Sequence, residues 1–251
     1  MSTLPLTGRV ALVTGGTRNI GRAVALALAA SGAQVAINSR REDDDSRATL
    51  DMIRQAGGQA LHVVADVAQE SEVERMVNTT ARTFGGVDIL VHCAGIRRVN
   101  GLLDISLAEW RDVMATNLDA AFLCSKAVVP HMRPGVGRLV YISGISAFRG
   151  APQRAHVVTS KAALVGLARA LATELAPRHI TVNCIAPGPI DTIRGTDAGV
   201  IPQHPQGTTT PLGRLGQPSE ISAMVNLLAS DAGAFTTGQV LHINGGMHLG
   251  T

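Results

Sequence analysis

Residues 9–21 read RVALVTGGTRNIG, an apolar run that leads into a glycine-rich turn. Gly15 permits a tight turn after a strand, and Gly21 lets the following helix approach the sheet closely. Backbone N–H groups at the start of that helix would face a phosphate, which is how a dinucleotide pyrophosphate is bound. The stretch therefore predicts a strand, a phosphate-binding turn and a helix in direct succession.

Strand and helix patterns alternate along the whole chain. Short apolar runs rich in Val and Ile predict strands at 10–14, 34–38, 59–64, 87–92, 138–142, 180–185 and 239–243. Helices are predicted at 21–30, 45–56, 70–84, 107–131, 156–176 and 220–229. Because crossovers between parallel strands are right-handed and pack back on the sheet, this order predicts a single α/β domain over residues 1–251. We expect a Rossmann-type, doubly wound parallel sheet of seven strands with helices on both faces.

Composition narrows the class of protein. The 251 residues are 45% hydrophobic but 2% aromatic, which favours a core of Ala, Val, Leu and Ile. The net charge is +3 with scattered Arg and Lys, so neither nucleic acid nor membrane is an expected partner. Cys93, Cys124 and Cys184 lack metal or disulfide spacing and are expected to be free thiols. We expect no metal, and the absence of a signal-like or membrane-spanning run predicts a cytoplasmic protein.

Two long segments fit neither pattern. Residues 94–106 and 187–218 follow predicted strands, and the binding crevice of an open α/β sheet lies beyond the carboxyl ends of its strands. The Gly, Pro and Thr content of residues 187–218 is typical of a lid over a substrate. The alternative is a simple surface excursion.

Further motifs stand at the ends of later strands. Asp66-Val67 ends the third strand, Ala94-Gly95 the fourth, and Pro187-Gly188 with Thr192 follows the sixth. Ser160-Lys161 lies beyond a strand and a glycine-rich loop. With the turn at 14–21, these motifs resemble the short-chain dehydrogenase/reductase family over nearly the whole chain. The resemblance implies hydride transfer between a nicotinamide cofactor and a carbonyl or alcohol carbon.

The resemblance also assigns a cofactor site. Asn19 stands where the family has its middle glycine, and Asn tolerates a positive φ better than other non-glycine residues, so we expect the turn to survive. Asp66 matches the residue that contacts adenine, and Lys161 is expected to reach the nicotinamide ribose. The expected cofactor-binding residues are Gly15, Thr17, Arg18, Asn19, Ile20, Gly21, Ser39, Arg40, Arg41, Asp66, Val67, Ala94, Gly95, Lys161, Pro187, Gly188 and Thr192.

The end of the second strand predicts which cofactor binds. An acidic residue there would bond the ribose 2′-hydroxyl of NAD, whereas this chain has Ser39-Arg40-Arg41. Arg18 lies in the glycine-rich turn itself. Guanidinium groups suit a 2′-phosphate, so we predict NADP(H) in preference to NAD(H). The alternative is that Arg41 is a solvated residue at a helix start.

The catalytic positions are incomplete. Asn117 and Lys161 match the relay asparagine and the lysine of the family. The family's tyrosine, four residues before the lysine, is Val157 here, and its serine is Gly144. Neither residue carries an ionisable proton. The one tyrosine, Tyr141, lies inside a predicted strand and is expected in the core.

Two neighbouring residues are candidate replacements. The interval from Ser143 to His156 equals the family's usual interval from serine to tyrosine, and an imidazole with a pKa near ~6.5 is a competent acid. A helix turns ~100° per residue, so His156 points away from the direction of residue 157 unless the helix start is shifted. A histidine at the helix start that faces solvent or a neighbouring subunit is the alternative.

Three functions remain open on sequence alone. The first is an NADP(H)-dependent oxidoreductase with a substitute proton donor, either His156 or water held by Asn117 and Lys161. The second is a catalytically inactive NADP(H)-binding protein or partner subunit, and the third is a non-redox isomerase or lyase on the same fold.

Partners can be predicted more coarsely. Five arginines border the expected crevice and favour an anionic small-molecule substrate, unless they are simply solvated: Arg97, Arg98, Arg149, Arg154 and Arg194. The family resemblance implies a homotetramer, or failing that a dimer, that associates through helices 107–131 and 156–176 and the segment from Gln239.

Overall fold

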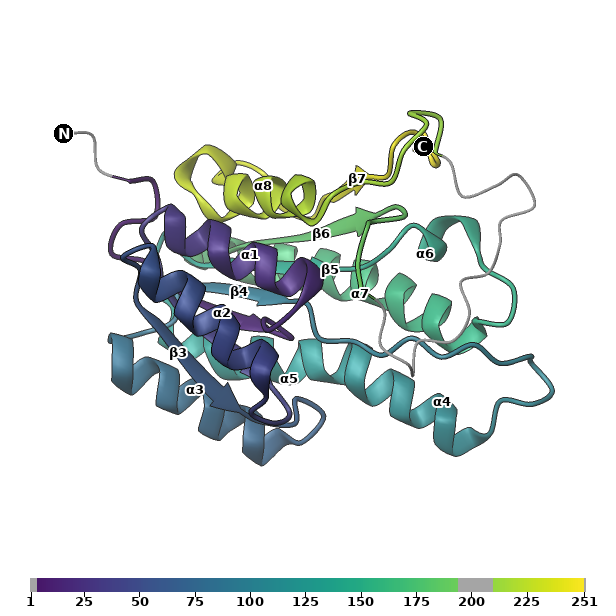
Figure 1. Cartoon of the computed structure of the whole chain (residues 1–251), viewed down its shortest axis with the longest axis horizontal. Helices are drawn as coiled ribbons and strands as arrows, with labels where there is room; N and C mark the ends of the chain where they lie inside the picture. The colour runs from purple at the N-terminus through teal and green to yellow at the C-terminus, as the bar shows by residue number, and fades with distance from the viewer. Residues whose placement is uncertain (1–3, 194–209, 251) are drawn as a thin grey trace.

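Seven parallel strands form one sheet in a computed structural model that describes residues 4–193 and 210–250 (Figure 1). Their order across the sheet is β3-β2-β1-β4-β5-β6-β7. Parallel strands need helical crossovers, and the predicted alternation supplies them. The predicted doubly wound fold is confirmed. The strands are β1 (Val10–Thr14), β2 (Gln34–Ser39), β3 (Ala60–Val64), β4 (Ile89–His92), β5 (Arg138–Ile142), β6 (Thr181–Pro187) and β7 (Val240–Ile243).

Helices cover both faces of the sheet. One apolar layer joins the strands to α3 (Glu70–Phe84), α5 (Ala120–Val128) and α7 (Ala155–Leu175). The other joins them to α1 (Asn19–Ala30), α2 (Asp44–Gln55) and α8 (Pro218–Ala229). Figure 1 shows α1 beside α8 over one face and α3 near α5 over the other. The core is built mainly from Ala, Val, Leu and Ile, as the composition predicts.

The helical segment predicted at 107–131 is interrupted by a wider turn. It divides into α4 (Leu107–Met114), a π-helical turn (Ala115–Asp119), α5 and a 3₁₀ turn (Val129–His131). A π turn inserts an extra residue into the helix and is frequent at functional sites. Here it carries the buried Asn117. The short helix α6 (Ser146–Arg149) was not predicted.

The order of the strands determines where a ligand can bind. The chain passes outward from β1 to β3 on one side and from β4 to β7 on the other, so the reversal point lies between β1 and β4. Ligands of open α/β sheets bind at such a point, beyond the carboxyl ends of the strands. The predicted lid begins at the carboxyl end of β6, although its residues 194–209, with Arg194, lie outside the described part of the chain.

Two classes of feature are absent from residues 4–193 and 210–250. No helix there is long and apolar enough to cross a bilayer. No group of three or more His, Cys, Asp or Glu side chains is placed to hold a metal ion. Cys93, Cys124 and Cys184 are free thiols, in agreement with the prediction; Cys124 and Cys184 are buried, and Cys93 is partly exposed.

Candidate active site and cofactor cleft

The predicted cofactor residues gather at one edge of the sheet. Apart from Lys161 in α7, they lie at or just beyond the carboxyl ends of β1, β2, β3, β4 and β6. Parallel strands bring these ends together although the residues span most of the chain.

The glycine-rich turn adopts the backbone that the sequence predicts. Gly15 has φ +61° and Asn19 has φ +51°, so asparagine replaces a glycine at a left-handed position. A Cβ on Gly21 would overlap the carbonyl oxygen of Gly15, which explains the close approach of α1. Within the described structure, Arg18 precedes α1 without a side-chain cap, which leaves N–H groups at the helix start for an anion.

Three exposed arginines lie on the two segments that form the predicted adenosine end of this edge. The turn and the end of β2 are adjacent, because the Gly16 N–H donates to the Asn38 carbonyl at 3.1 Å. Arg18, Arg40 and Arg41 are all exposed, and the Arg41 side chain is 85% exposed with Asp43 at 3.9 Å. Mobile exposed guanidinium groups can turn toward a phosphate.

The Ser39 side chain holds the backbone that follows β2. Its Oγ donates to the Arg41 carbonyl at 2.6 Å and lies 2.9 Å from His62 Nε2. The backbone that carries Arg40 and Arg41 is thus held against β3. At the end of β3, Asp66 Oδ1 accepts from the Ala68 N–H at 3.0 Å, which stabilises the turn at the predicted adenine contact.

Lys161, Asn117 and Ser160 form a buried cluster at the nicotinamide end. Lys161 Nζ donates to the Ile142 carbonyl at 2.8 Å. Asn117 Nδ2 donates to Ser160 Oγ at 2.9 Å, and Asn117 Oδ1 accepts from the Ile96 N–H at 2.8 Å. Sequence reasoning missed the positioning role of Ser160, because its neighbour Lys161 carries the recognisable charge.

Burial changes the acidity of the Lys161 amine. Desolvation, with a smaller contribution from the positive charge of Arg97, lowers the pKa of Lys161 to about 8. The residue one helical turn before it is Val157, whose side chain is also buried. A Cβ built on Gly144 would have Ser146 Oγ as its nearest neighbour, at 3.8 Å. The structure therefore puts an aliphatic side chain one helical turn before the lysine, and a Cβ on Gly144 would make a single contact within 4 Å.

Comparison with known proteins decides the family. A family model described as Enoyl-(Acyl carrier protein) reductase matches residues 15–248. A 3-oxoacyl-[acyl-carrier-protein] reductase of Synechocystis sp. is 40% identical over 96% of this chain and 98% of its own length. The FabG protein of that name from Escherichia coli (strain K12) is 39% identical over the same shares. The chain belongs to the short-chain dehydrogenase/reductase family.

Solved structures agree with this membership. A short-chain dehydrogenase from Burkholderia cenocepacia in complex with NADP superposes with a TM-score of 0.88 at 35% identity, over 96% of this chain and 98% of that one. A short-chain dehydrogenase/reductase from Serratia marcescens gives 0.89 at 35% identity, over the same shares. The chain is an oxidoreductase of the short-chain dehydrogenase/reductase type by family.

The two candidate replacement donors do not meet at the family's catalytic position. Ser143 Oγ donates to the Lys161 carbonyl at 2.8 Å, so its hydroxyl serves the backbone of α7. His156 is fully buried, and its Nε2 lies 3.0 Å from Glu109 Oε1. The solvent-facing alternative for His156 is wrong, because the ring joins α7 to α4 inside the protein, whereas its catalytic role stays a prediction. Glu109 also accepts from Asn100, and these two partners lower its pKa.

Other titratable groups near the lysine are held in one protonation state. His92, which sequence reasoning did not single out, lies with Nδ1 3.0 Å from Thr14 Oγ1. Burial, reinforced by Lys161, lowers the pKa of His92 to about 3, so the ring is neutral. Burial also raises the pKa of Cys93 to about 12. The core position predicted for Tyr141 is confirmed: it is fully buried, with its hydroxyl 2.6 Å from Ser125 Oγ.

The arginines predicted to border the crevice differ in exposure and pairing. Arg98 forms an ion pair with Asp112 at 3.3 Å on the neighbouring helix α4. Arg97 and Arg149 are exposed, and Arg154 is half-buried.

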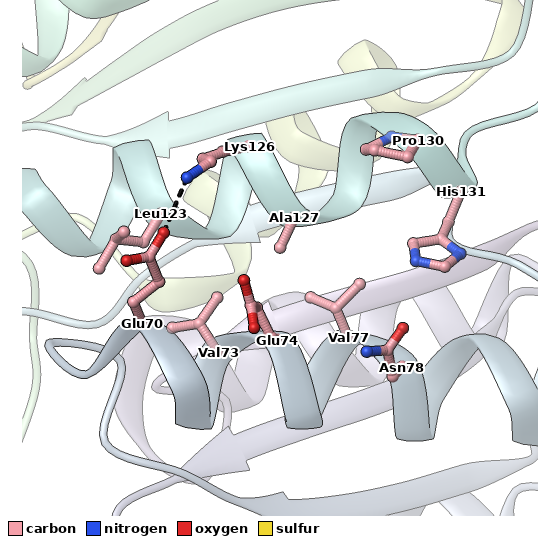
Figure 2. Close-up of a pocket in the computed structure, with 10 residues that line it drawn as sticks. All are labelled: Glu70, Val73, Glu74, Val77, Asn78, Leu123, Lys126, Ala127, Pro130 and His131. Carbon is pink, nitrogen blue, oxygen red and sulfur yellow. Dashed lines mark hydrogen bonds and ion pairs between the residues drawn. The ribbon is translucent and has the colours of Figure 1, made fainter.

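A groove between α3 and α5 lies apart from all predicted site residues (Figure 2). Lys126 and Glu70 form an ion pair of 2.7 Å across one end, and Val73, Val77 and Leu123 line the floor. The pair is half-exposed, so its contribution to stability is small. The groove contributes nothing to the cofactor cleft.

Proposed function

We propose that this chain reduces a carbonyl group with NADPH and that the Lys161 ammonium group supplies the proton in place of a tyrosine phenol. The observation that carries the proposal is the difference in acidity among three neighbouring groups. Lys161 has a pKa of about 8, whereas His92 has a pKa of about 3 and Cys93 one of about 12. At neutral pH, Lys161 is the member of this trio that both carries a proton and can release it.

NADP(H) fits the residues at the carboxyl edge. The close packing of Gly15 and Gly21, together with the uncapped start of α1, suits a pyrophosphate. The exposed Arg18, Arg40 and Arg41 suit a 2′-phosphate, which supports a preference for NADP(H) over NAD(H). When bound, the cofactor supplies a hydride to the carbonyl carbon.

Lys161 completes the reduction. As the new C–H bond forms, the Lys161 ammonium group donates its proton to the carbonyl oxygen, and the product is an alcohol. The neutral Lys161 amine then regains a proton from solvent water. A water molecule between Lys161 and the substrate could carry the same proton.

Asn117 is a positioning residue in this mechanism. Its amide holds the segment after β4 through Ile96 and holds α7 through Ser160. Because Lys161 follows Ser160 directly in α7, these bonds keep the lysine near the end of β4. Rigid placement of this kind lowers the entropic cost of reaching the transition state.

The relatives support a substrate class. The two curated relatives are named for acting on 3-oxoacyl groups of acyl carrier protein. We extend that class to this chain and propose a 3-oxo carbonyl on an acyl chain, with an anionic portion near Arg97 or Arg149. We also propose a homotetramer, because Leu107 and Phe122 leave apolar surface exposed on α4 and α5.

The test follows NADPH absorbance with the purified protein and a panel of 3-oxoacyl thioesters, ketones and aldehydes. We expect slow NADPH consumption that Lys161→Met abolishes. Gly166→Ser, on the same helix with no neighbour within 4 Å of its Cβ, is the matched control and should retain the rate. NADPH binding without consumption of NADPH at any pH would overturn the proposal.

Val157 and Gly144 favour a second candidate, an NADP(H)-binding protein without turnover. Both positions lack a hydroxyl group, although the cofactor edge is intact. Equilibrium binding of NADPH separates the two candidates. Tight binding with no product under all substrate conditions would favour the second.

A further inference from the structure

The side chain of Asn19 joins the phosphate-binding turn to the segment that follows β6. Asn19 Nδ2 donates to the Ile193 carbonyl at 2.8 Å, and the Ile193 N–H donates to Asn19 Oδ1 at 3.0 Å. The amide thus pairs with one backbone residue through two hydrogen bonds, across 174 positions of sequence. A glycine, which is the family's residue at this position, could form neither bond.

Backbone contacts hold the rest of this segment, which we call the strap (residues 188–193). The Gly188 N–H donates to the Ile243 carbonyl of β7 at 2.9 Å, and the Asp191 N–H donates to the Gly216 carbonyl at 2.8 Å. Ile190 also forms a bridge with Gly216. The strap is therefore tied to the β7 side by main chain and to the α1 side by the side chain of Asn19.

The position of this pair has a consequence for a bound dinucleotide. Asn19 is the first residue of α1, where the N–H groups available to a pyrophosphate lie. The strap carries Thr192, a predicted cofactor residue, directly before Ile193. Because the Asn19–Ile193 pair bridges the turn and the strap, a pyrophosphate bound at the start of α1 would lie next to this connection.

We propose that Asn19 is a latch that retains the cofactor by closing the strap over the pyrophosphate. The inference rests on the cofactor site of the proposed function and adds a residue that controls how fast NADP(H) enters and leaves. The pair is exposed, so it can open without unfolding of the core. Opening must precede both entry and release of the cofactor.

Asn19→Gly tests the latch without disturbing the backbone. Glycine adopts a positive φ freely, so the turn keeps its shape while both hydrogen bonds are lost. We expect about a tenfold faster release of NADPH, as the loss of two modest hydrogen bonds implies. The association rate should also rise, because the same pair bridges the cleft of the protein without cofactor. Both rates are measured by stopped-flow fluorescence of NADPH.

His179→Gly is the matched control. His179 is another non-glycine residue at positive φ (+55°), and it lies just before β6, at the opposite edge of the sheet. Glycine there should leave both rates unchanged. A general effect of relieving backbone strain would instead appear in both variants and would overturn the latch.

Hydrogen–deuterium exchange gives a readout that needs no turnover. In Asn19→Gly, the Ile193 amide should exchange faster, while the Gly188 amide, bonded to Ile243, should not change. An NADPH release rate within twofold of the original protein, or an unchanged Ile193 exchange rate, would overturn the latch. If the original protein did not bind NADPH at all, the proposed function itself would be wrong.

Discussion

Val157 lies one helical turn before Lys161 on α7, and the two residues are 4% and 8% exposed. Residues four apart share a helix face, so the lysine has an aliphatic neighbour where a phenol would stand in the family's pattern. Burial of the Lys161 amine lowers its pKa to about 8. A lysine with this lowered pKa is the acid that the proposed mechanism requires.

The rate of carbonyl reduction should follow the protonation of Lys161. Since its pKa is about 8, the ammonium form is present below that pH, and the rate should fall as pH rises through it. Alcohol oxidation needs the neutral amine and should show the opposite trend. Lys161→Arg, which stays protonated, should lose turnover and the inflection together. A kcat profile with its inflection near ~6.5 would point to a histidine instead.

Restoring the family's hydroxyl groups should increase turnover. The space beside Gly144 accepts a serine side chain, and Val157→Tyr puts a phenol one turn before Lys161. We expect the double variant Gly144→Ser/Val157→Tyr to consume NADPH about a hundredfold faster, the lower end of the range for a general acid. The single variants are the controls. If the double variant folded correctly but its turnover did not change, residues other than 144 and 157 would also have to differ from the family's active site.

Cofactor preference should depend on the arginines after β2. Arg40→Ala/Arg41→Ala should weaken NADPH binding by about three- to tenfold, because each exposed charge contributes modestly, and should leave NADH binding unchanged. Arg47→Ala is the matched control, since Arg47 is already paired with Glu42 and Asp44. Dissociation constants measured by calorimetry at low salt test this. An equal loss for NADH and NADPH would refute the phosphate role.

His156 should matter for stability and not for the chemical step. His156→Ala removes a buried ring and one partner of Glu109, which should lower the free energy of unfolding by about 2 kcal/mol. Urea denaturation measures that loss. Without urea, where the variant is folded, its kcat should stay within about twofold of that of the original protein, because the His156 ring bonds Glu109 of α4. If His156→Ala lost kcat while its free energy of unfolding stayed unchanged, His156 would be the better candidate for the proton donor.

Tyr141 should act only in the core. Tyr141→Phe removes the hydrogen bond to Ser125 and should cost about 1 kcal/mol of unfolding free energy without changing NADPH consumption. Ser125 also donates to the Ala121 carbonyl, so Ser125→Ala alone would remove two hydrogen bonds. A double-mutant cycle of Tyr141→Phe and Ser125→Ala therefore isolates the energy of the Tyr141–Ser125 pair. If Tyr141→Phe abolished turnover with normal stability, the assignment of Tyr141 to the core would fail.

Most of the fold could be predicted because its signals are local. The bounds predicted for β1, β5 and α3 coincide with those observed. In each of these elements, the apolar residues that pack in the core end at the last residue of the strand or helix or one residue before it. The π turn at Asn117 was missed, because the apolar pattern of 107–131 continues through it. The four-residue α6 was missed because it is too short to show a period.

The chain itself determined the strand–turn–helix motif, the positive φ at Asn19 and the absence of hydroxyl groups at positions 144 and 157, because each depends on residue identity and near neighbours. The tertiary structure alone decided that His156 binds Glu109, that Lys161 is desolvated and that Asn19 pairs with Ile193. Those properties depend on segments far apart in sequence that packing brings together. Acidity and hydrogen bonding respond to that surrounding protein, which local sequence does not encode.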